Sequence, residues 1–578
     1  MDCNGSLSYR VFIDKRLRLL VALLFVLWSG QSFGQAGRPS AGGDVIEILK
    51  ANQLKGLNTG TSESRELLGN VAIRHKGALM YCDRAIQNLT NNSIEAFGNV
   101  RIVQGDTVTV RGDTLFYFGA TRQANVRGRV TLRDRKMTLT TRRLDYDMLS
   151  GIAHYPVPGR IVDRENILTS REGYYDTRTK LFTFRQNVRL VNPKYTMTAD
   201  SLLYNSFTKI ATFQGPTRIV SKDGTLVAKE GEYNTITRVS NFQRRATIET
   251  DKYRLTGDSL GGNSTSEFYV AKGNVVLFAK NDKTILTGES GRYNRKTGVA
   301  RMTGNAVVKS ITAESDTMFM RADTLWSFEI PDKNAKPTKP GSTTATATKR
   351  RLIGDRNVLI YKNDLQSKCD SIVYDTADST IVFFGDPIVW STNYQMEADS
   401  MTARLKNNRI HTMFLRSKSF VISQDTLQQF NQVKGRAITA YFDYKPKVDR
   451  SDISLVVVEG NGESNYFAVD EKNKLVGMNH VQCSKMNIRF DDTRKVKNIR
   501  FIGQPDSQFI PPHELSENKK RLDGFNWQKN QRPTKRQVLG LEKPPVRPTD
   551  DSSKKLLKTS ASAKPLPPKT VLNDIKKK

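Results

Sequence analysis

The feature that most constrains this chain is a sequence repeat of about 29 residues. A glycine, usually followed by Asn or Arg and then a β-branched residue, recurs at spacings of 29 to 31 residues or at about twice that spacing. These glycines are Gly69, Gly98, Gly128, Gly159, Gly215, Gly273 and Gly304. Gln186-Asn187-Val188 and Arg244-Arg245-Ala246 fill the two long gaps. A fixed period in this range is typical of one supersecondary unit stacked many times, not of a single globular enzyme.

We call this series of glycines the glycine ladder. A second repeated motif, an acid between two small residues followed by an apolar residue, alternates with it along the sequence, and we call it the acid ladder. It occurs at residues 112–115, 199–202, 257–260, 322–325, 369–372 and 398–401, and Glu takes the acidic position at 230 and 289. Because the acid recurs once per unit, we interpret it as a structural residue and not as a catalytic or calcium-binding group. An Asp side chain can accept hydrogen bonds from backbone N–H groups two residues on, which stabilises a turn.

Polar turns divide each unit further, for example at Gln104-Gly105-Asp106, Asp134-Arg135-Lys136 and Lys222-Asp223-Gly224. A turn every seven or eight residues predicts strands of about five residues. Between the turns, apolar and polar residues alternate, as in Val130-Thr131-Leu132-Arg133. Alternation with one wet face is typical of antiparallel strands. Between residues 60 and 504 only Leu365–Asp370 shows a short helical pattern, so the sequence predicts an all-β chain.

The N-terminus predicts export. Arg10, Lys15, Arg16 and Arg18 precede the apolar run Leu19–Trp28, and Ser32-Phe33-Gly34 offers a small-x-small cleavage site. This pattern is typical of a secretory signal peptide over residues 1–34, and its ten apolar residues are about half of the roughly 20 that span a bilayer. The net charge of +33 favours anionic partners, but export excludes nucleic acid as the physiological one.

Changes in composition and periodicity predict the domain boundaries. Residues 35–61 form a leader, 62–328 a first repeat array, 329–350 a Pro/Thr-rich linker or loop and 351–504 a second array. The remaining residues, 505–578, are Pro- and Lys-rich. Low hydrophobicity combined with high charge predicts that this basic tail is mostly disordered.

No pattern indicates catalysis or a bound cofactor. The five histidines are scattered, and the chain has no HExxH, CxxC, Walker or nucleophile-elbow motif. Cys82, Cys369 and Cys483 occupy positions that other repeats fill with small residues. Such positions in distant repeats do not meet, so no disulfide framework is expected. The sequence therefore predicts no enzyme, no metal site and no cofactor.

The remaining class of function is the binding of a ligand along an apolar interior. If the array is open along one side, its inward residues line a groove for lipid, because an acyl chain of about 12 carbons gains on the order of 10 kcal/mol on leaving water. If it is closed, the same residues form an ordinary core. The candidate lining residues are Val71, Ile73, Val100, Ile102, Val130, Leu132, Met137, Leu139, Val188 and Leu190. Lys and Arg at the rim of such a groove would pair with lipid phosphates.

The glycine and acid ladders, following a signal peptide, resemble the OstA-like (organic solvent tolerance-like) N-terminal domain family. The resemblance covers residues 62–328 and continues less clearly through 351–504. Val481-Gln482-Cys483 through Pro511-Pro512-His513-Glu514-Leu515 is similar to the ending of large Bacteroidetes-type members of this family.

This resemblance implies an elongated antiparallel β-jelly-roll in the periplasm or associated with the outer membrane. It implies that lipopolysaccharide is carried with its lipid A acyl chains in the apolar interior. It also implies, as partners, an outer-membrane translocon barrel, an inner-membrane export complex and end-to-end copies of the protein. The chain departs from the family pattern in its length, in its basic tail and in having no following barrel-like region.

Two other classes of protein fit a repeat of this length. One is a β-helix enzyme or adhesin that acts on acidic polysaccharide, and the other is a structural scaffold of the cell envelope with a closed core. A β-helix enzyme needs clustered side chains on one rung that interrupt the repeat. Here the acids follow the repeat, which favours the carrier.

Overall fold

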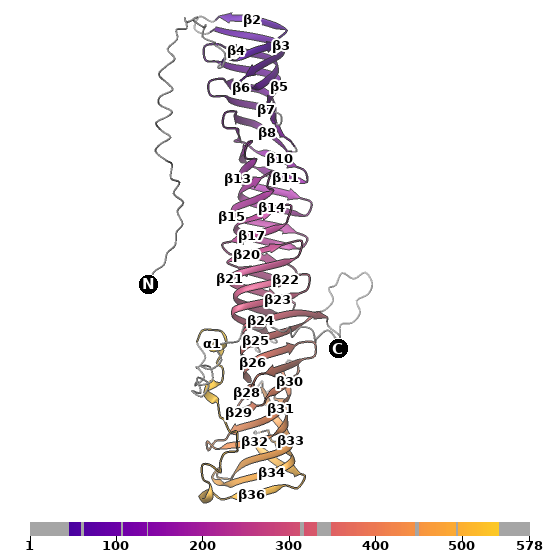
Figure 1. Cartoon of the computed structure of the whole chain (residues 1–578), viewed down its shortest axis with the longest axis vertical. Coiled ribbons are helices and arrows are strands. Elements are labelled where there is room, and N and C mark those ends of the chain that lie inside the picture. The colour runs from indigo at the N-terminus through magenta and orange to yellow at the C-terminus, as the bar shows by residue number, and fades with distance from the viewer. Residues whose placement is uncertain are drawn as a thin grey trace, which may run out of the picture.

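The computed structural model describes residues 45–58, 63–105, 108–135, 137–281, 283–311, 317–331, 348–407, 409–445, 450–492 and 495–542. These residues form one sheet of 36 strands, paired antiparallel throughout. The strands run across the long axis of the molecule and stack along it, so that the protein is a narrow column (Figure 1). This arrangement confirms the predicted elongated all-β repeat. The predicted signal peptide, residues 1–34, lies outside the described residues.

The strands form an antiparallel meander in which some strands are split in two. In the upper part they are β1 (Glu47–Lys50), β2 (Gln53–Asn58), β3 (Glu63–His75), β4 (Ala78–Asn88), β5 (Ser93–Gln104), β6 (Val108–Phe118), β7 (Gln123–Asp134), β8 (Met137–Asp147), β9 (Ile152–Tyr155), β10 (Gly159–Asp163), β11 (Asn166–Ser170), β12 (Glu172–Asp176), β13 (Leu181–Asn192), β14 (Tyr195–Asn205), β15 (Ile210–Ser221), β16 (Gly224–Asn234), β17 (Val239–Gln243), β18 (Ala246–Glu249), β19 (Tyr253–Gly257), β20 (Ser259–Asn263), β21 (Phe268–Ala279), β22 (Thr284–Asn294), β23 (Val299–Ile311) and β24 (Thr317–Pro331). In the lower part they are β25 (Thr348–Lys362), β26 (Leu365–Asp375), β27 (Thr380–Phe384), β28 (Ile388–Ser391), β29 (Tyr394–Glu397), β30 (Ser400–Lys406), β31 (Arg409–Gln424), β32 (Phe430–Lys445), β33 (Arg450–Val469), β34 (Leu475–Phe490), β35 (Val496–Ile502) and β36 (Asp506–Ile510). As an example of a split strand, β9 and β10 both pair with β8 and not with each other.

Most strands are about twice as long as the sequence predicted, because the glycine ladder bends strands and does not end them. Gly98 and Asn99, at φ of 73° and 45°, lie inside β5, whose pairing with β6 skips from Phe97 to Val100. Two consecutive left-handed residues also build a type I′ hairpin turn. Here the pairing resumes on the far side, so the strand carries a bulge that turns its direction. Many of the predicted five-residue strands are therefore halves of bent strands, whereas β9–β12, β17–β20 and β27–β30 are separate strands of four to seven residues, close to the predicted length.

The acids of the second ladder support these bends from the neighbouring strand. Asn99 Nδ2 donates to Asp83 Oδ2 over 2.8 Å, and Asn274 Nδ2 donates to Asp258 Oδ2 over 2.7 Å. The acids are structural, as predicted. The predicted bonding scheme is wrong, however, because these acids accept from side chains 16 residues on and not from local backbone N–H groups.

The bends give each repeat two facing walls. The first wall consists of the strand halves that meet at hairpins such as β5–β6, and the second of the halves that meet at hairpins such as β6–β7. Alternate side chains from both halves point inward, for example Ile94 and Ile102 of β5. One cluster of buried apolar residues extends between the walls from Ile46 to Ile488.

The two predicted arrays are parts of one sheet. β24 and β25, which flank residues 332–347, pair directly from Phe319 opposite Tyr361 to Pro331 opposite Thr348. Residues at the edges of the predicted linker, 329–331 and 348–350, are therefore strand. The helical pattern at 365–370 is also strand, because it opens β26 and pairs with β25.

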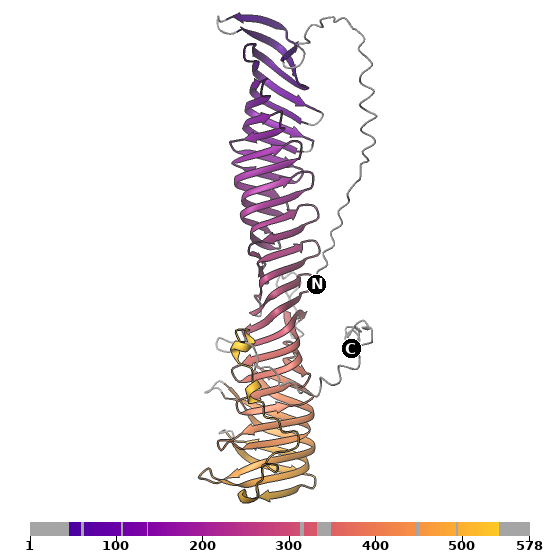
Figure 2. The ribbon, with the colours of Figure 1, turned by 60° about the vertical axis from the view of Figure 1, so that its left-hand side comes forward.

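The predicted disordered tail requires correction over residues 505–542. This segment contains β36, the 3-10 helices η2 (Pro512–Glu514) and η3 (Lys529–Gln531), and the helix α1 (Lys535–Val538). After β36 the chain turns back and runs along the outside of the lower half to α1 beside β24 and β25 (Figures 1 and 2). We call residues 511–542 the strap. Buried Leu522 packs against Phe420 and Ile422, and buried Val538 packs against Phe319 and Leu359.

The described part of the chain contains no helix that is long and apolar enough to cross a membrane. Cys82, Cys369 and Cys483 are buried and unpaired. Burial raises the pKa of the Cys369 thiol to about 12, so this thiol stays protonated and unreactive near neutral pH.

Candidate functional site

The interior of the column is an unbroken row of apolar residues in cross-strand register. It begins with Ile73 opposite Met80 and ends with Met320 opposite Ile360. In order, the row contains Ile73, Met80, Ile102, Val110, Leu132, Leu139, Ile161, Leu168, Leu190, Met197, Ile219, Leu226, Ile248, Leu255, Leu277, Leu286, Val308, Met320 and Ile360. Every member of this row is apolar, and the row extends over most of the length of the molecule.

The structure brings all ten predicted lining residues together on this face of the first wall. Five of them belong to the row, and the other five, such as Val71 and Val100, lie two residues away on the same strands. Each has at most 4% of its surface exposed. Their inward orientation is as the alternation predicted, whereas contact with lipid remains a prediction.

The two walls meet along the side opposite the bends, and polar side chains join them there. We call this line of contacts the seam. Tyr204, near the β14–β15 hairpin, donates to Asp163, at the β10–β11 hairpin, over 3.1 Å. Lys209 Nζ reaches the same carboxylate oxygen at 2.7 Å. One repeat earlier, Tyr175 and Lys180 make the same pair of contacts to Asp134.

Polar side chains without a carboxylate close the seam nearer the N-terminus. His75 Nδ1 and the hydroxyl of Tyr117 are 2.6 Å apart, and Tyr146 donates to Gln104. Burial raises the pKa of Tyr117 to about 12. Burial also raises the pKa of Tyr204, where the neighbouring Asp163 carboxylate adds to the effect. These hydroxyls therefore keep their protons, and that of Tyr204 donates across the seam.

Tyrosine pairs replace the charged contacts farther along the seam. The rings of Tyr195 and Tyr233 meet edge to face at 5.6 Å, and those of Tyr253 and Tyr293 at 4.5 Å. Arg295 also joins the walls, since it donates to Asp223 at 3.0 Å and to Glu267 at 2.9 Å. Side chains of the two walls thus meet along the upper half, where Ile219 and Leu226 of the row remain half-buried.

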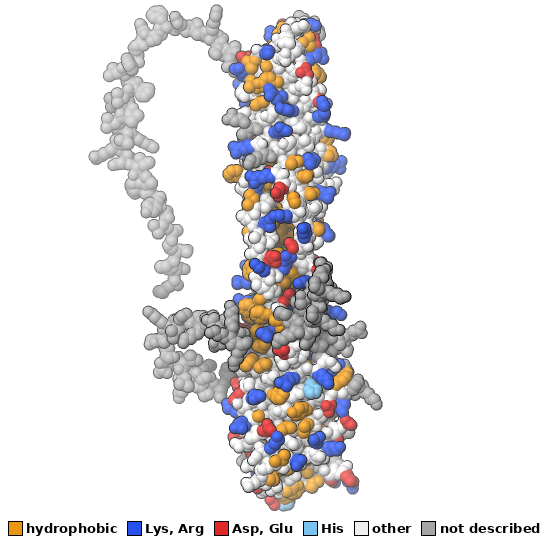
Figure 3. Space-filling model, turned by 90° about the vertical axis from the view of Figure 1, so that its right-hand side faces the viewer, with side chains coloured by type: hydrophobic (Ala, Val, Ile, Leu, Met, Phe, Trp, Pro, Cys, Tyr) orange, Lys and Arg blue, Asp and Glu red, His pale blue; other side chains and the backbone are white. Residues whose placement is uncertain are grey.

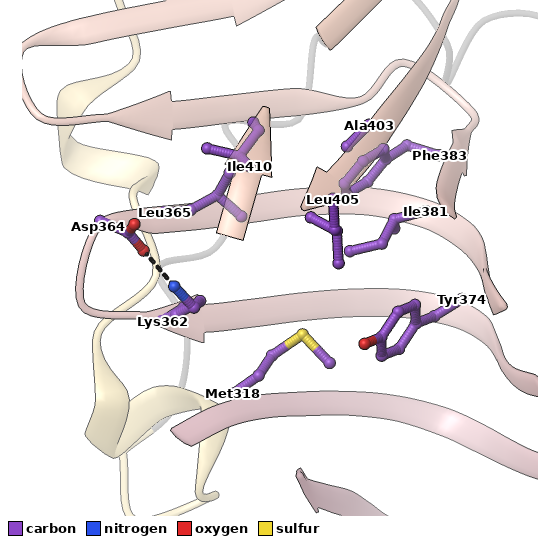
Figure 4. Close-up of a pocket in the computed structure, with 10 residues that line it drawn as sticks. All are labelled: Met318, Lys362, Asp364, Leu365, Tyr374, Ile381, Phe383, Ala403, Leu405 and Ile410. Carbon is purple, nitrogen blue, oxygen red and sulfur yellow. Dashed lines mark hydrogen bonds and ion pairs between the residues drawn. The ribbon is translucent and has the colours of Figure 1, made fainter. Parts of the chain in front are cut away.

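A small cavity of about 30 Å³ lies in the core where β24, β25 and β26 meet β27, β30 and β31 (Figure 4). Lys362 and Asp364, both 8% exposed, form a 2.8 Å ion pair on one side of it. Met318, Tyr374 and Phe383 are among the other lining residues. The cavity has room for about one water molecule and is too small for an acyl chain.

A larger cavity of about 670 Å³ lies between the walls near the C-terminal end, lined by β31 to β35 and by Tyr394. Its apolar side includes Val433, Phe490 and Ile499, which are only half-buried. Its size falls within the range of small-molecule sites. The walls therefore stand apart here, unlike in the upper half.

The outer surface is strongly basic. Lys and Arg side chains are distributed over the whole length of the face in Figure 3, and Asp and Glu are fewer in its upper half. The tips of several second-wall hairpins also expose apolar residues beside basic ones. Leu149, Phe207 and Ile236 are 67%, 80% and 64% exposed, and Arg238 follows Ile236 two residues later.

The tyrosines of the seam were not predicted from the sequence, although they follow the same period. Tyr117, Tyr146, Tyr175, Tyr204 and Tyr233 are each 29 residues apart. Their spacing is the signal that could have identified them. Asp134, which accepts from Tyr175, was interpreted as an ordinary turn residue, but it is 4% exposed and points into the seam.

Within the described residues, no group of three or more His, Cys, Asp or Glu side chains is placed to hold a metal ion. Comparison with protein families gives one match: the family described as OstA-like protein matches residues 43–200 and 196–258. The matched region extends from the leader to the acid ladder at Asp258. No curated protein shows significant similarity to the chain.

Proposed function

On the premise that residues 43–258 are OstA-like, we propose that this protein carries lipopolysaccharide through the periplasm towards the outer membrane. It would act as a non-enzymatic carrier, with the lipid A acyl chains between the two walls. The family suggests this role in general terms. The finer assignment to this chain, including its ligand and its partners, is our inference.

The observation that carries the proposal is the unbroken apolar row from Ile73 to Ile360. Each methylene that leaves water is stabilised by about 0.8 kcal/mol, so an acyl chain gains free energy at every rung of such a row. Consecutive rungs are equivalent, and a chain can move from one to the next without crossing a polar barrier. A closed core must still open along the seam to admit lipid.

The basic surface supports an anionic cargo. The phosphates of lipid A would lie outside the seam while the acyl chains lie inside. Arg178 and Arg238 are on second-wall hairpins beside the seam, and Arg can bind phosphate in a bidentate way. Partners in the inner and outer membranes would meet the two ends of the column, where strand edges are available.

Lipid binding by the exported form, residues 35–578, tests the proposal. The protein would be purified from a Gram-negative host, its bound lipid identified by mass spectrometry, and the delipidated protein titrated with lipopolysaccharide. We expect saturable binding that lipid A competes. Leu132→Asp should weaken loading because it places a charge in the row, whereas Thr131→Asp, which faces the other way on β7, should not.

A structural scaffold is the alternative, and the complete burial of the ten lining residues favours it. A scaffold needs no opening of the seam, and its charged surface would bind polysaccharide or other envelope components. Folded protein that contains no lipid and takes up no lipopolysaccharide would support the scaffold and contradict the carrier.

A further inference from the structure

The cavity of about 670 Å³ at the C-terminal end has a chemical character that differs from the rest of the column. We propose that it is a separate binding site for a single-chain amphiphile whose head is an uncharged sugar and not a phosphate. The site lies far outside the OstA-like match, which ends at residue 258. It goes beyond the proposed transport function and does not depend on it.

The floor of the cavity is suited to one alkyl chain. Val421, Val433, Ile488, Phe490 and Ile499 line it from both walls. Val433, Phe490 and Ile499 remain half-buried although they pack against the main core. Apolar surface that the fold itself leaves partly open gains free energy when a chain covers it.

Two turns hold the rim of the cavity in a fixed shape. Asp425 Oδ1 accepts from the backbone N–H groups of Leu427 and Gln429, both over 2.8 Å. Asp470 Oδ1 holds the 470–474 turn in the same way. The side chains of Asn473 and Thr426 join the two turns over 3.1 Å. A rim that is already ordered loses little conformational freedom when it binds a ligand.

The composition of the rim selects the head group. Its described lining residues include three acids, Asp425, Asp470 and Glu471, against one base, Lys495. Lys472 and Lys474 belong to the same turn as Glu471 but do not line the cavity. Amide and hydroxyl groups, including Gln424, Asn431 and Ser423, complete the rim. Carboxylates and amides hydrogen-bond sugar hydroxyls, whereas a phosphate meets like charge here.

Two detergents of equal chain length test the site. The full exported chain would be titrated by calorimetry with dodecyl maltoside and with dodecyl phosphate, both below their micelle concentrations. We expect one saturable maltoside site and binding of the phosphate that is weaker by on the order of tenfold. Equal or tighter binding of dodecyl phosphate would overturn the proposal.

Matched variants locate the binding. Val433→Trp fills the cavity and should abolish maltoside binding, whereas Val476→Trp, at a 45% exposed position of β34, should leave it unchanged. Retained binding in Val433→Trp would overturn the assignment. If that variant does not fold, Glu471→Lys at the exposed rim provides the test, because it should shift the preference towards dodecyl phosphate.

The outcomes separate this site from the transport function. Lipopolysaccharide loading without any maltoside site would refute the cavity assignment alone. A maltoside site in protein that takes up no lipopolysaccharide would refute the transport function alone.

Discussion

At the scale of single residues, the seam contains buried charged groups that the stability of the fold does not by itself require. Asp163 is 5% exposed and is matched by Lys209 and Tyr204. Replacing a buried ion pair by apolar residues is often neutral or stabilising. Polar contacts can separate and find water as new partners, whereas an apolar seam would not open at comparable cost. The charged contacts are thus compatible with the opening of the seam that the proposed lipid loading requires.

Lys209→Met should loosen the seam locally. The Asp163 carboxylate would then stay buried without its ammonium partner, which costs about 3–5 kcal/mol. Amide hydrogen exchange in β10, β11, β14 and β15 would measure this loss, because a repeat array does not unfold as one unit. Tyr204→Phe should cost less, about 1.5–3 kcal/mol, as it removes one hydrogen bond to a charged group.

The exposed pair of Arg129 and Asp113 provides the control for that experiment. Its side chains meet at 3.0 Å, but the arginine is 91% exposed. Arg129→Met should therefore change exchange protection little, since solvent screens such pairs. Equal effects of Lys209→Met and Arg129→Met on exchange protection would show that the seam contacts stabilise the fold no more than an exposed ion pair does.

Acid should weaken the hairpin of β18 and β19. Hydrogen bonds from Arg254 and Lys280 lower the pKa of Glu249 from 4.5 to about 2. A carboxylate with a lowered folded-state pKa stabilises the fold above its unfolded-state pKa, and this contribution disappears as the pH falls from about 4.5 to about 2. Exchange protection of β18 and β19 should fall over this interval, and Glu249→Gln should lose the dependence.

At the scale of elements, the strap holds the lower half of the column together. It runs from β36 to α1 and covers one wall from outside, where Gln432 and Gln395 bond to its backbone. Buried Leu522 is its central apolar anchor. The strap thus joins the last strands of the molecule to β24 and β25.

Leu522→Ala should release the strap without unfolding the sheet. Removing a buried leucine side chain costs about 2–5 kcal/mol, and the apolar anchors that remain in this segment include Phe525, Trp527 and Val538. Limited proteolysis should cut within residues 511–534 faster than in the unaltered protein. Leu541→Ala, at a position 63% exposed, should leave the cleavage rate unchanged. Unchanged cleavage in Leu522→Ala would mean that the other contacts of the strap hold it without Leu522.

The elements also show how far sequence reasoning could go. The period and the alternation predicted the repeat and the inward side of residues such as Ile102 and Leu132. The predicted length was wrong for the bent strands because Gly98 and Asn99 adopt the local dihedrals of a hairpin turn. Only the strand pairing beyond these two residues distinguishes a bend within a strand from a turn that ends it. The contact of Tyr175 with Asp134 spans 41 residues, so it depends on how the walls fold together.

At the scale of the whole molecule, the column has an exposed strand at its N-terminal end. Among the described residues β2 pairs only with β3, so one of its edges offers unpaired backbone groups. Leu54 of β2 is 55% exposed, and Val45, which precedes the neighbouring edge strand β1, is 65% exposed. An apolar edge strand of this kind can add a strand from another chain. If the added strand comes from the C-terminal end of another copy, the contact is head-to-tail and produces open linear assemblies and not closed dimers.

Leu54→Lys should therefore suppress self-association or docking at this end. A charge on an edge strand opposes the addition of another strand, and exposed Leu54 can be replaced with little loss of stability. Sedimentation velocity over a concentration series would show a smaller weight-average sedimentation coefficient for this variant at high concentration. Leu149→Lys is the control, because Leu149 is 67% exposed on the β8–β9 hairpin, away from the edge strand β2. Equal association of both variants and the unaltered chain would place the contact elsewhere and leave the N-terminal edge for a different partner.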